Sequence, residues 1–193
     1  MDFIEKLIED FALLPGIGKK SAMRIALYLV QNRNISEVLL NDLDYTIKNI
    51  KICKYCNNLS TDDECNICKD NTRDKKVCVV ETISDLYAIE ETKDYKGYYF
   101  VLSKLINPSK GIFVEDLGLD KLKNLIINKN IEEVIFMLNY TPEAQITIDY
   151  IKEYLDGMNL RFSKISVGIP IGASIEFLDK TTLRLAFNER KEI

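Results

Sequence analysis

The stretch Cys53-Lys54-Tyr55-Cys56, followed after a spacer of eight residues by Cys65-Asn66-Ile67-Cys68, decides how this chain is organised. In each Cys-x2-Cys pair the short gap lets both sulfur atoms point at one centre, and the polar spacer lets the second pair fold back onto the first. The chain contains no histidine, so the candidate ligands are all thiolates. The spacing predicts one tetrahedral zinc ion held by Cys53, Cys56, Cys65 and Cys68, because a reducing cytosol favours metal over disulfides.

This zinc site is expected to be structural. A closed four-cysteine site leaves no open coordination position for chemistry, and it can contribute on the order of 10 kcal/mol to the folding of its own loop. We expect it to fix the helical segment that precedes it relative to the strands that follow. The fifth cysteine lies in the apolar run Val77-Cys78-Val79-Val80 and is expected to be a small buried hydrophobe.

The composition is that of a globular protein. The 193 residues suffice for one α/β domain with one or two small appendages. Hydrophobic residues make up 47% of the chain, and the mean hydropathy is −0.09. No apolar run is long enough to span a membrane, and the acidic, amphipathic start does not resemble a signal peptide. A cytoplasmic protein without a membrane partner is therefore expected.

The charge is unevenly distributed. The net charge is −4, yet residues 15–34 contain Lys19, Lys20, Arg24 and Arg33 and no acid. This stretch carries +4, so the remainder carries −8. Binding of nucleic acid, if it occurs, should be local or should depend on several subunits.

The run Pro15-Gly16-Ile17-Gly18-Lys19-Lys20-Ser21 lies between two apolar patterns with helical spacing. Gly16 and Gly18 permit a tight turn, and the first amides of the second helix carry partial positive charge. Lys19 and Lys20 flank these amides, and Arg24 shares the face of Lys20. The pattern favours a helix-hairpin-helix that holds a nucleic-acid phosphate without reading bases. The alternative is a simple turn with solvated lysines, and the spacing excludes a Walker A loop.

The remaining periodicity predicts an α/β fold with a parallel sheet that has helices on both faces. Helices are expected over 2–14, after the glycines, and near 36–50 with Ser36 as N-cap. Expected strands over 77–81, 98–102, 133–138 and 162–167 alternate with helices over 84–92, 115–129 and 143–155. The expected division is 1–52 for the helix-hairpin-helix segment, 53–76 for the zinc finger, 77–171 for the α/β domain and 172–193 for a C-terminal segment.

The case for catalysis is weak. Glu81 ends the first expected strand, where such folds place their chemistry. A magnesium-dependent phosphodiester enzyme needs further carboxylates nearby, but the third strand leads into Asn139 and then Glu143, without an Asp-x-Asp pair. Such an enzyme, a nuclease or primase-like protein, is kept as an alternative, as is a zinc-bearing adaptor that binds only proteins.

A C-terminal run also suggests a nucleotide-binding element. The segment Ile175-Glu176-Phe177-Leu178-Asp179 has the form of a Walker B strand, an apolar run that ends in an aspartate. Without a Walker A loop it cannot complete an ATP site. An ordinary strand that ends at a helix cap is an equally good interpretation.

The chain resembles one family throughout its length, the bacterial recombination mediator family RecR. The resemblance rests on four motifs in order: Leu14-Pro15-Gly16-Ile17-Gly18-x-Lys20-Ser21-Ala22-x-Arg24; the four cysteines; Arg73-Asp74 with Val77–Glu81 and Ala88-Ile89-Glu90; and Gly168-x-Pro170-x-Gly172 with Glu176, Asp179, Thr182-Leu183 and Ala186. It implies a helix-hairpin-helix, a four-cysteine zinc finger, a Toprim domain and a Walker B-like segment.

The resemblance also implies a DNA repair factor that is not an enzyme. Members assemble into rings, often tetramers, that can encircle DNA, and they work with RecO and/or RecF to load RecA onto single strands coated by single-strand-binding protein. The DNA-binding residues are then Gly16, Gly18, Lys19, Lys20 and Arg24, of which Lys20 and Arg24 match the family's DNA-contacting positions, and Glu81 and Glu143 are assigned to partner binding.

Two positions depart from the family pattern. Glu143 is followed by Ala144-Gln145 where the family usually has Gly-Glu. Ser103-Lys104 stands where the family tends to have Gly-Gly, ahead of Leu105-Ile106-Asn107-Pro108. The missing acid at Gln145 weakens any metal site of the Toprim type.

Overall fold

The computed structural model describes residues 2–166, 168–188 and 190. The chain divides into two compact units, Met1–Ile50 and Lys51–Ile193, and each is described by itself. Among the described residues, no helix is both long enough and apolar enough to serve as a membrane span.

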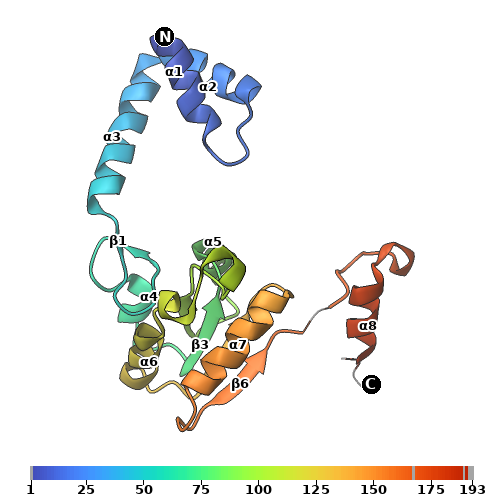
Figure 1. The fold of residues 1–193 in the computed structure, drawn as a ribbon. Coiled ribbons are helices and arrows are strands. Elements are labelled where there is room, and N and C mark those ends of the chain that lie inside the picture. The colour runs from blue at the N-terminus through green and yellow to red at the C-terminus, as the bar shows by residue number, and fades with distance from the viewer. Residues whose placement is uncertain (1, 167, 189, 191–193) are drawn as a thin grey trace. The chain divides into compact units, whose positions relative to one another are not determined.

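The first unit consists of three helices, α1 (Phe3–Ala12), α2 (Lys19–Gln31) and α3 (Arg33–Asn49) (Figure 1). Helix α1 begins in a capping box, in which the side chains of Asp2 and Glu5 each accept from the other residue's backbone N–H. Ala22 and Ala26 of α2 are completely buried, because their small side chains allow the close packing of α1 on α2. The predicted pair of helices with a glycine-containing turn is confirmed.

The start of the third helix was predicted wrongly. Helix α3 begins at Arg33, and its N-cap is Asn32 rather than Ser36. Asn32 alone joins α2 to α3, so the chain resumes a helical path sooner than the Ser36 signal suggests. The Ser36 hydroxyl instead donates to the carbonyl oxygen of Leu29 at 2.5 Å, which ties the two helices together.

The second unit starts with the cysteine segment and continues into a four-stranded sheet. Strands β1 (Lys51–Ile52) and β2 (Leu59–Ser60) pair antiparallel, and the short helix α4 spans Asn66–Lys69. The four strands of the main sheet are all parallel, in the order β4-β3-β5-β6, which confirms the predicted α/β fold. Their bounds are β3 Lys76–Val80, β4 Tyr98–Val101, β5 Glu133–Met137 and β6 Arg161–Lys164.

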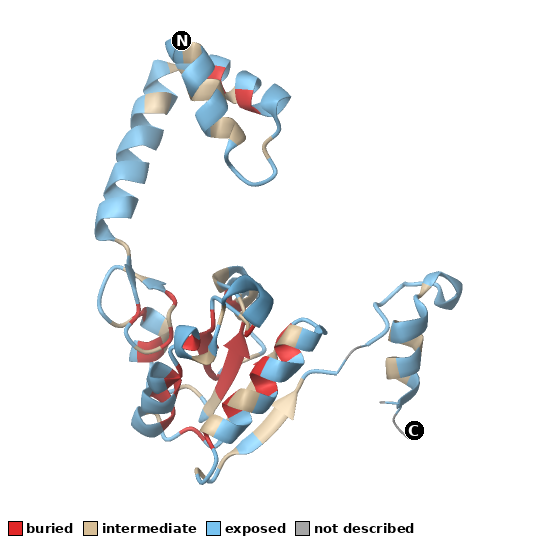
Figure 2. Ribbon diagram, in the orientation of Figure 1, coloured by how far each residue is buried: buried red, intermediate tan, exposed pale blue. Residues whose placement is uncertain are grey.

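Helices lie on both faces of this sheet, α5 (Ile83–Thr92), α6 (Leu119–Asn128) and α7 (Pro142–Tyr154). Val77 and Val79 of β3 point into a core shared with α6, α7 and the cysteines, whereas Cys78 and Val80 pack with α5. Figure 2 shows the buried residues concentrated in this central strand and the inner faces of the helices. Ile135 of β5, on the α5 side, is only half-buried, so α5 covers mainly the β3–β4 half of its face.

One predicted helix, 115–129, is broken. Val114–Leu117 forms a 3-10 turn, and α6 starts at Leu119. Gly118 between them has φ +60°, a left-handed conformation that suits glycine and interrupts a continuous helix. The apolar pattern continues through the break, which is why periodicity alone did not reveal it.

The Walker B-like strand was also predicted wrongly. Ile175–Phe177 forms a 3-10 turn, and α8 follows over Lys180–Asn188. The Asp179 carboxylate accepts from the backbone N–H groups of Thr181 and Thr182, at 2.9 and 3.0 Å. Asp179 therefore caps α8, and the helix-cap part of the alternative interpretation is correct.

An ion pair between Arg73 and Glu90 stabilises the start of the sheet. The Arg73 guanidinium bonds to the Glu90 carboxylate of α5 and donates to the carbonyl oxygen of Gly97 at 2.8 Å. The same contact with Arg73 lowers the pKa of Glu90. The pair joins the segment after the cysteines to α5 and to the loop before β4.

Candidate functional site

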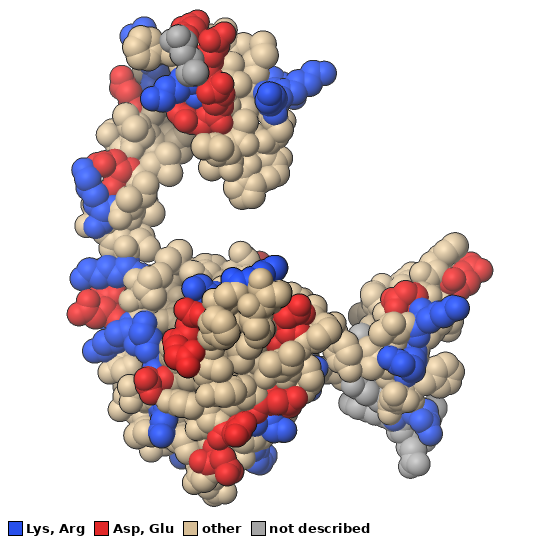
Figure 3. Space-filling model, viewed as in Figure 1, with Lys and Arg blue, Asp and Glu red and all other residues tan. Residues whose placement is uncertain are grey.

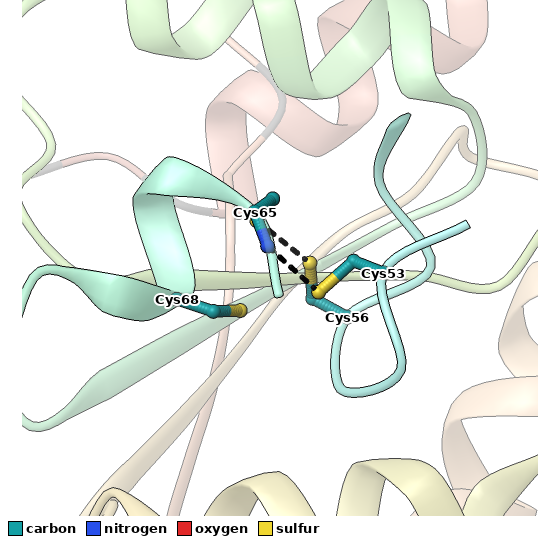
Figure 4. Close-up of side chains that lie close together, drawn as sticks. All are labelled: Cys53, Cys56, Cys65 and Cys68. Carbon is teal, nitrogen blue, oxygen red and sulfur yellow. Dashed lines mark hydrogen bonds between the residues drawn. The ribbon is translucent and has the colours of Figure 1, made fainter. Parts of the chain in front are cut away.

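The four cysteines form one metal centre. Their sulfur atoms all lie within 4.8 Å of one another, and those of Cys56 and Cys65 are 3.5 Å apart. Zinc–sulfur bonds of about 2.3 Å place sulfurs about 3.8 Å apart at the corners of a tetrahedron. The side chains of Cys53 and Cys56 approach from one loop, and those of Cys65 and Cys68 from the start and third residue of α4 (Figure 4). The predicted ligand set therefore fits a zinc ion.

Hydrogen bonding favours a thiolate at Cys53, against the opposing effect of burial. Hydrogen bonds from the thiols of Cys56, Cys65 and Cys68 hold the pKa of Cys53 well below its ordinary value. The backbone N–H of Cys65 also donates to the Cys53 sulfur, at 3.4 Å. The thiolate is the form that binds zinc. By contrast, burial raises the pKa of Cys78 to about 12, so this residue is the inert buried hydrophobe that was predicted.

The zinc centre is continuous with the core of the sheet. All four cysteines are buried and belong to the same apolar cluster as β3, α6 and α7. The charges around it are largely paired: Lys51 lies 3.2 Å from Asp63, and Lys69 pairs with Asp62. The zinc finger is thus a structural part of the second unit, and its lysines lie on a surface that carries both positive and negative charges.

The predicted DNA-binding residues surround the turn between α1 and α2. Gly16 has φ +78°, which is the conformation that requires glycine in this turn. Gly18 is the N-cap of α2, and it offers no side-chain hydrogen bond to the first turn. The first amides of α2 therefore face outward without a capping side chain, and Lys20 and Arg24 are exposed one turn apart.

The structure divides the predicted basic cluster. Lys19 lines a groove together with Glu5 and Glu9 of α1. Arg24 lines a different groove, with Ser21 and Tyr28 on the same face of α2. Figure 3 shows basic side chains that project from this unit beside acidic ones. Lys20 and Arg24 are consequently the better placed pair for a phosphate contact.

Glu81 and Glu143 line one groove of about 420 Å³ at the carboxyl edge of the sheet. Each carboxylate has an amide partner: Asn139 donates to Glu81 at 3.4 Å, and Asn107 donates to Glu143 at 3.5 Å. Two cations, Lys104 and Lys110, complete the polar lining. Within the described ranges, the cysteines are the only group of three or more potential ligands close enough to share a metal ion.

Sequence reasoning missed three residues that shape these sites. Asn57 connects the first cysteine pair to β4, Asn107 holds Glu143, and Ser103 adopts φ +63° beside Glu81. Only Ser103 left a signal, since it stands where the family tends to have glycine. The other two contacts join residues 44 and 36 positions apart, which local patterns do not reveal.

Comparisons with known proteins agree on one family. The chain matches the family models for the RecR helix-hairpin-helix over residues 4–42, the RecR four-cysteine zinc finger domain over 50–70, the Toprim domain over 75–166 and the RecR C-terminal region over 168–191. Recombination protein RecR of Francisella philomiragia is 42% identical over 192 residues, which cover 98% of this chain and 95% of the relative. Recombination protein RecR of Orientia tsutsugamushi strain Ikeda is 41% identical over 193 residues, with 98% and 95% covered. These matches show that the chain belongs to the RecR family of recombination proteins.

Proposed function

We propose that this protein is a DNA-binding mediator of recombinational repair in the cytoplasm, which acts with RecO and/or RecF to load RecA onto single-stranded DNA coated by single-strand-binding protein. The observation that carries this proposal is the start of α2, an uncapped helix end flanked by exposed Lys20 and Arg24 in a segment without acids. Such a helix end binds phosphate oxygens through its amides and its dipole. It reads no bases, so binding is independent of sequence.

The charge balance makes several subunits necessary. The four cations of residues 15–34, on a chain with net charge −4, bind DNA weakly by themselves, but copies of this segment arranged around one ring act together. We propose a homo-oligomeric ring, a tetramer by resemblance to the family. Apolar side chains on α3 support self-assembly, since Val38, Leu40 and Leu43 are each at least half exposed.

The groove that contains Glu81 and Glu143 is proposed as the partner-binding surface. Its carboxylates suit basic side chains of RecO or RecF, and the amides of Asn107 and Asn139 hold them in place. The sequence supports a non-enzymatic role, because the third strand leads into Asn139 and no Asp-x-Asp pair follows it. The proposed division of roles follows the boundaries 1–52, 53–76, 77–171 and 172–193.

A titration of the purified protein against a labelled duplex–single-strand junction, with magnesium present, tests this function. We expect a shifted band on a native gel and intact strands on a denaturing gel, because the protein binds phosphates and its described residues bring no three carboxylates close enough to share a metal ion. Cleaved strands would establish the alternative, a Toprim-type magnesium-dependent phosphodiester enzyme. A junction that neither shifts nor is cleaved, even after RecO is added, would contradict DNA binding.

Neutralising the groove carboxylates should weaken partner binding. We expect Glu81→Gln/Glu143→Gln to reduce affinity for RecO of the same organism by about tenfold or more, because two charge-assisted contacts are lost. Calorimetry measures this directly. The control Glu91→Gln/Glu153→Gln removes two exposed carboxylates of α5 and α7 outside the groove. Equal affinities for both variants would contradict the assignment.

A further inference from the structure

The first cysteine pair binds the end of β4, an edge strand of the main sheet. The strand order β4-β3-β5-β6 leaves β4 at an edge, with backbone groups that have no neighbouring strand on their outer side. Val101, the last residue of β4, donates its N–H to the carbonyl oxygen of Cys56 at 2.9 Å. Its carbonyl oxygen accepts from the side-chain amide of Asn57, also at 2.9 Å. The two bonds reproduce what a partner strand would supply at this position.

Two features fix the conformation in which the Asn57 side chain reaches Val101. Its backbone has φ +62°, a left-handed conformation that asparagine tolerates better than most residues. Its side-chain oxygen accepts from the Lys121 ammonium of α6 at 2.9 Å, which orients the amide nitrogen toward Val101. One side chain thus connects the zinc finger, the edge of the sheet and a helix.

The chain that follows Val101 forms a wall of the groove that contains Glu81 and Glu143. The N–H groups of Leu102 and Ser103 donate to the carbonyl oxygens of Val80 and Glu81, each at 2.9 Å. Further on, the N–H of Ile106 donates to the Thr147 hydroxyl at 2.9 Å. Four residues of this segment line the groove: Ser103, Lys104, Leu105 and Asn107.

This segment contains one residue, Ser103, in a strained backbone conformation. Ser103 adopts φ +63°, a conformation that costs a non-glycine residue free energy and persists where neighbouring contacts impose it. Its position is two residues beyond the bonds from Cys56 and Asn57 and directly beside Glu81. A loss of the bonds at Val101 would therefore release the segment at its strained point.

We propose that Asn57 is a positioning residue through which the zinc-bound first cysteine pair sets the conformation of residues 102–107, and thereby the shape of the groove that contains Glu81 and Glu143. The zinc ion holds Cys56 in position. Cys56 and Asn57 in turn hold Val101 through two hydrogen bonds, and Val101 holds the wall of the groove. The inference concerns the shape of the groove; only its consequence for RecO rests on the proposed function.

Amide hydrogen exchange of the zinc-loaded, full-length protein, followed by mass spectrometry, tests this inference. Asn57→Gly keeps the left-handed backbone and removes the bond to the Val101 carbonyl. We expect exchange in peptides spanning 98–107 to become about fivefold faster, the effect of losing one net hydrogen bond. Peptides from β5 and the zinc content should remain unchanged. A residue that served only the zinc finger would instead alter peptides from 51–70 and leave 102–107 as they are.

Three further variants make the outcome specific. Asn66→Gly removes the same side chain from an exposed position in the second cysteine pair, and we expect no change over 98–107. Asn57→Asp keeps the acceptor for Lys121 but loses the donor to Val101, so it should match Asn57→Gly. Lys121→Ala, which leaves that donor in place, should produce a smaller change.

Unchanged exchange over 102–107 in Asn57→Gly, with zinc retained, would overturn the inference. The result is separable from that of the proposed partner surface. Exchange reports the groove wall without any partner, whereas Glu81→Gln/Glu143→Gln reports RecO binding with Asn57 intact. Either can fail while the other holds.

Discussion

Cys53→Ser is expected to abolish stoichiometric zinc binding and to destabilise the second unit. We expect the effect to be on folding and not on a catalytic step. A structural zinc site contributes on the order of 10 kcal/mol, and serine is a poor replacement for a thiolate ligand. The four cysteines share one apolar core with β3, α6 and α7, so the damage should spread beyond the loop. A loss of about 4 kcal/mol, less than half of that contribution, already corresponds to a thermal transition about 8–16 °C lower in a domain of this size. Metal analysis and calorimetry measure both effects.

Cys78→Ala is the matched control for this prediction. Cys78 is equally buried, but it lies in β3 outside the metal centre. Loss of one sulfur from the core should cost about 1–2 kcal/mol and leave the zinc content at one ion per chain. A Cys53→Ser protein that unfolds at the same temperature as the wild type, or a wild-type transition unaffected by zinc removal, would refute the structural role.

The zinc site was predictable from the sequence because its constraint is local. Two residues between cysteines can bring both sulfurs to one ion, and the second pair needs only a short spacer. The parallel sheet was predictable for a similar reason, since apolar runs such as Val77–Val80 alternate with helical patterns. Both features depend on residues that are close together along the chain.

Predictions that depended on distant contacts or single dihedral angles failed. Ser36 has the chemistry of an N-cap, but the one-residue connection at Asn32 moved the helix start. Gly118 broke an apolar pattern that looks continuous. The assignment of Lys19 to DNA binding stays a prediction, but local patterns did not reveal that Lys19 lines a groove with Glu5 and Glu9 of α1. Asn57 had no sequence signal, because its partner Val101 lies 44 positions away.

Lys20→Ala/Arg24→Ala is expected to weaken binding to the duplex–single-strand junction by about a hundredfold or more, because two charge-assisted contacts are lost and each costs about 1.5–3 kcal/mol. The loss should be uniform across DNA sequences, since phosphate contacts carry no base readout. The slope of log affinity against log salt should fall by about 1 for each phosphate contact removed. Fluorescence anisotropy at several salt concentrations measures all three quantities.

The division of the basic cluster makes this prediction sharper. Lys19→Ala should cost less than Lys20→Ala, because Lys19 lines a groove with the carboxylates of Glu5 and Glu9, which repel a phosphate. Lys6→Ala/Lys48→Ala removes the same net charge from α1 and α3 and serves as the control, with Lys48 already paired to Asp44 at 2.7 Å. If DNA binding depended only on net charge, the two double variants would lose the same affinity. A defined phosphate site instead predicts a large loss of affinity only for Lys20→Ala/Arg24→Ala. Equal losses, or an affinity independent of salt, would therefore contradict the site at the start of α2.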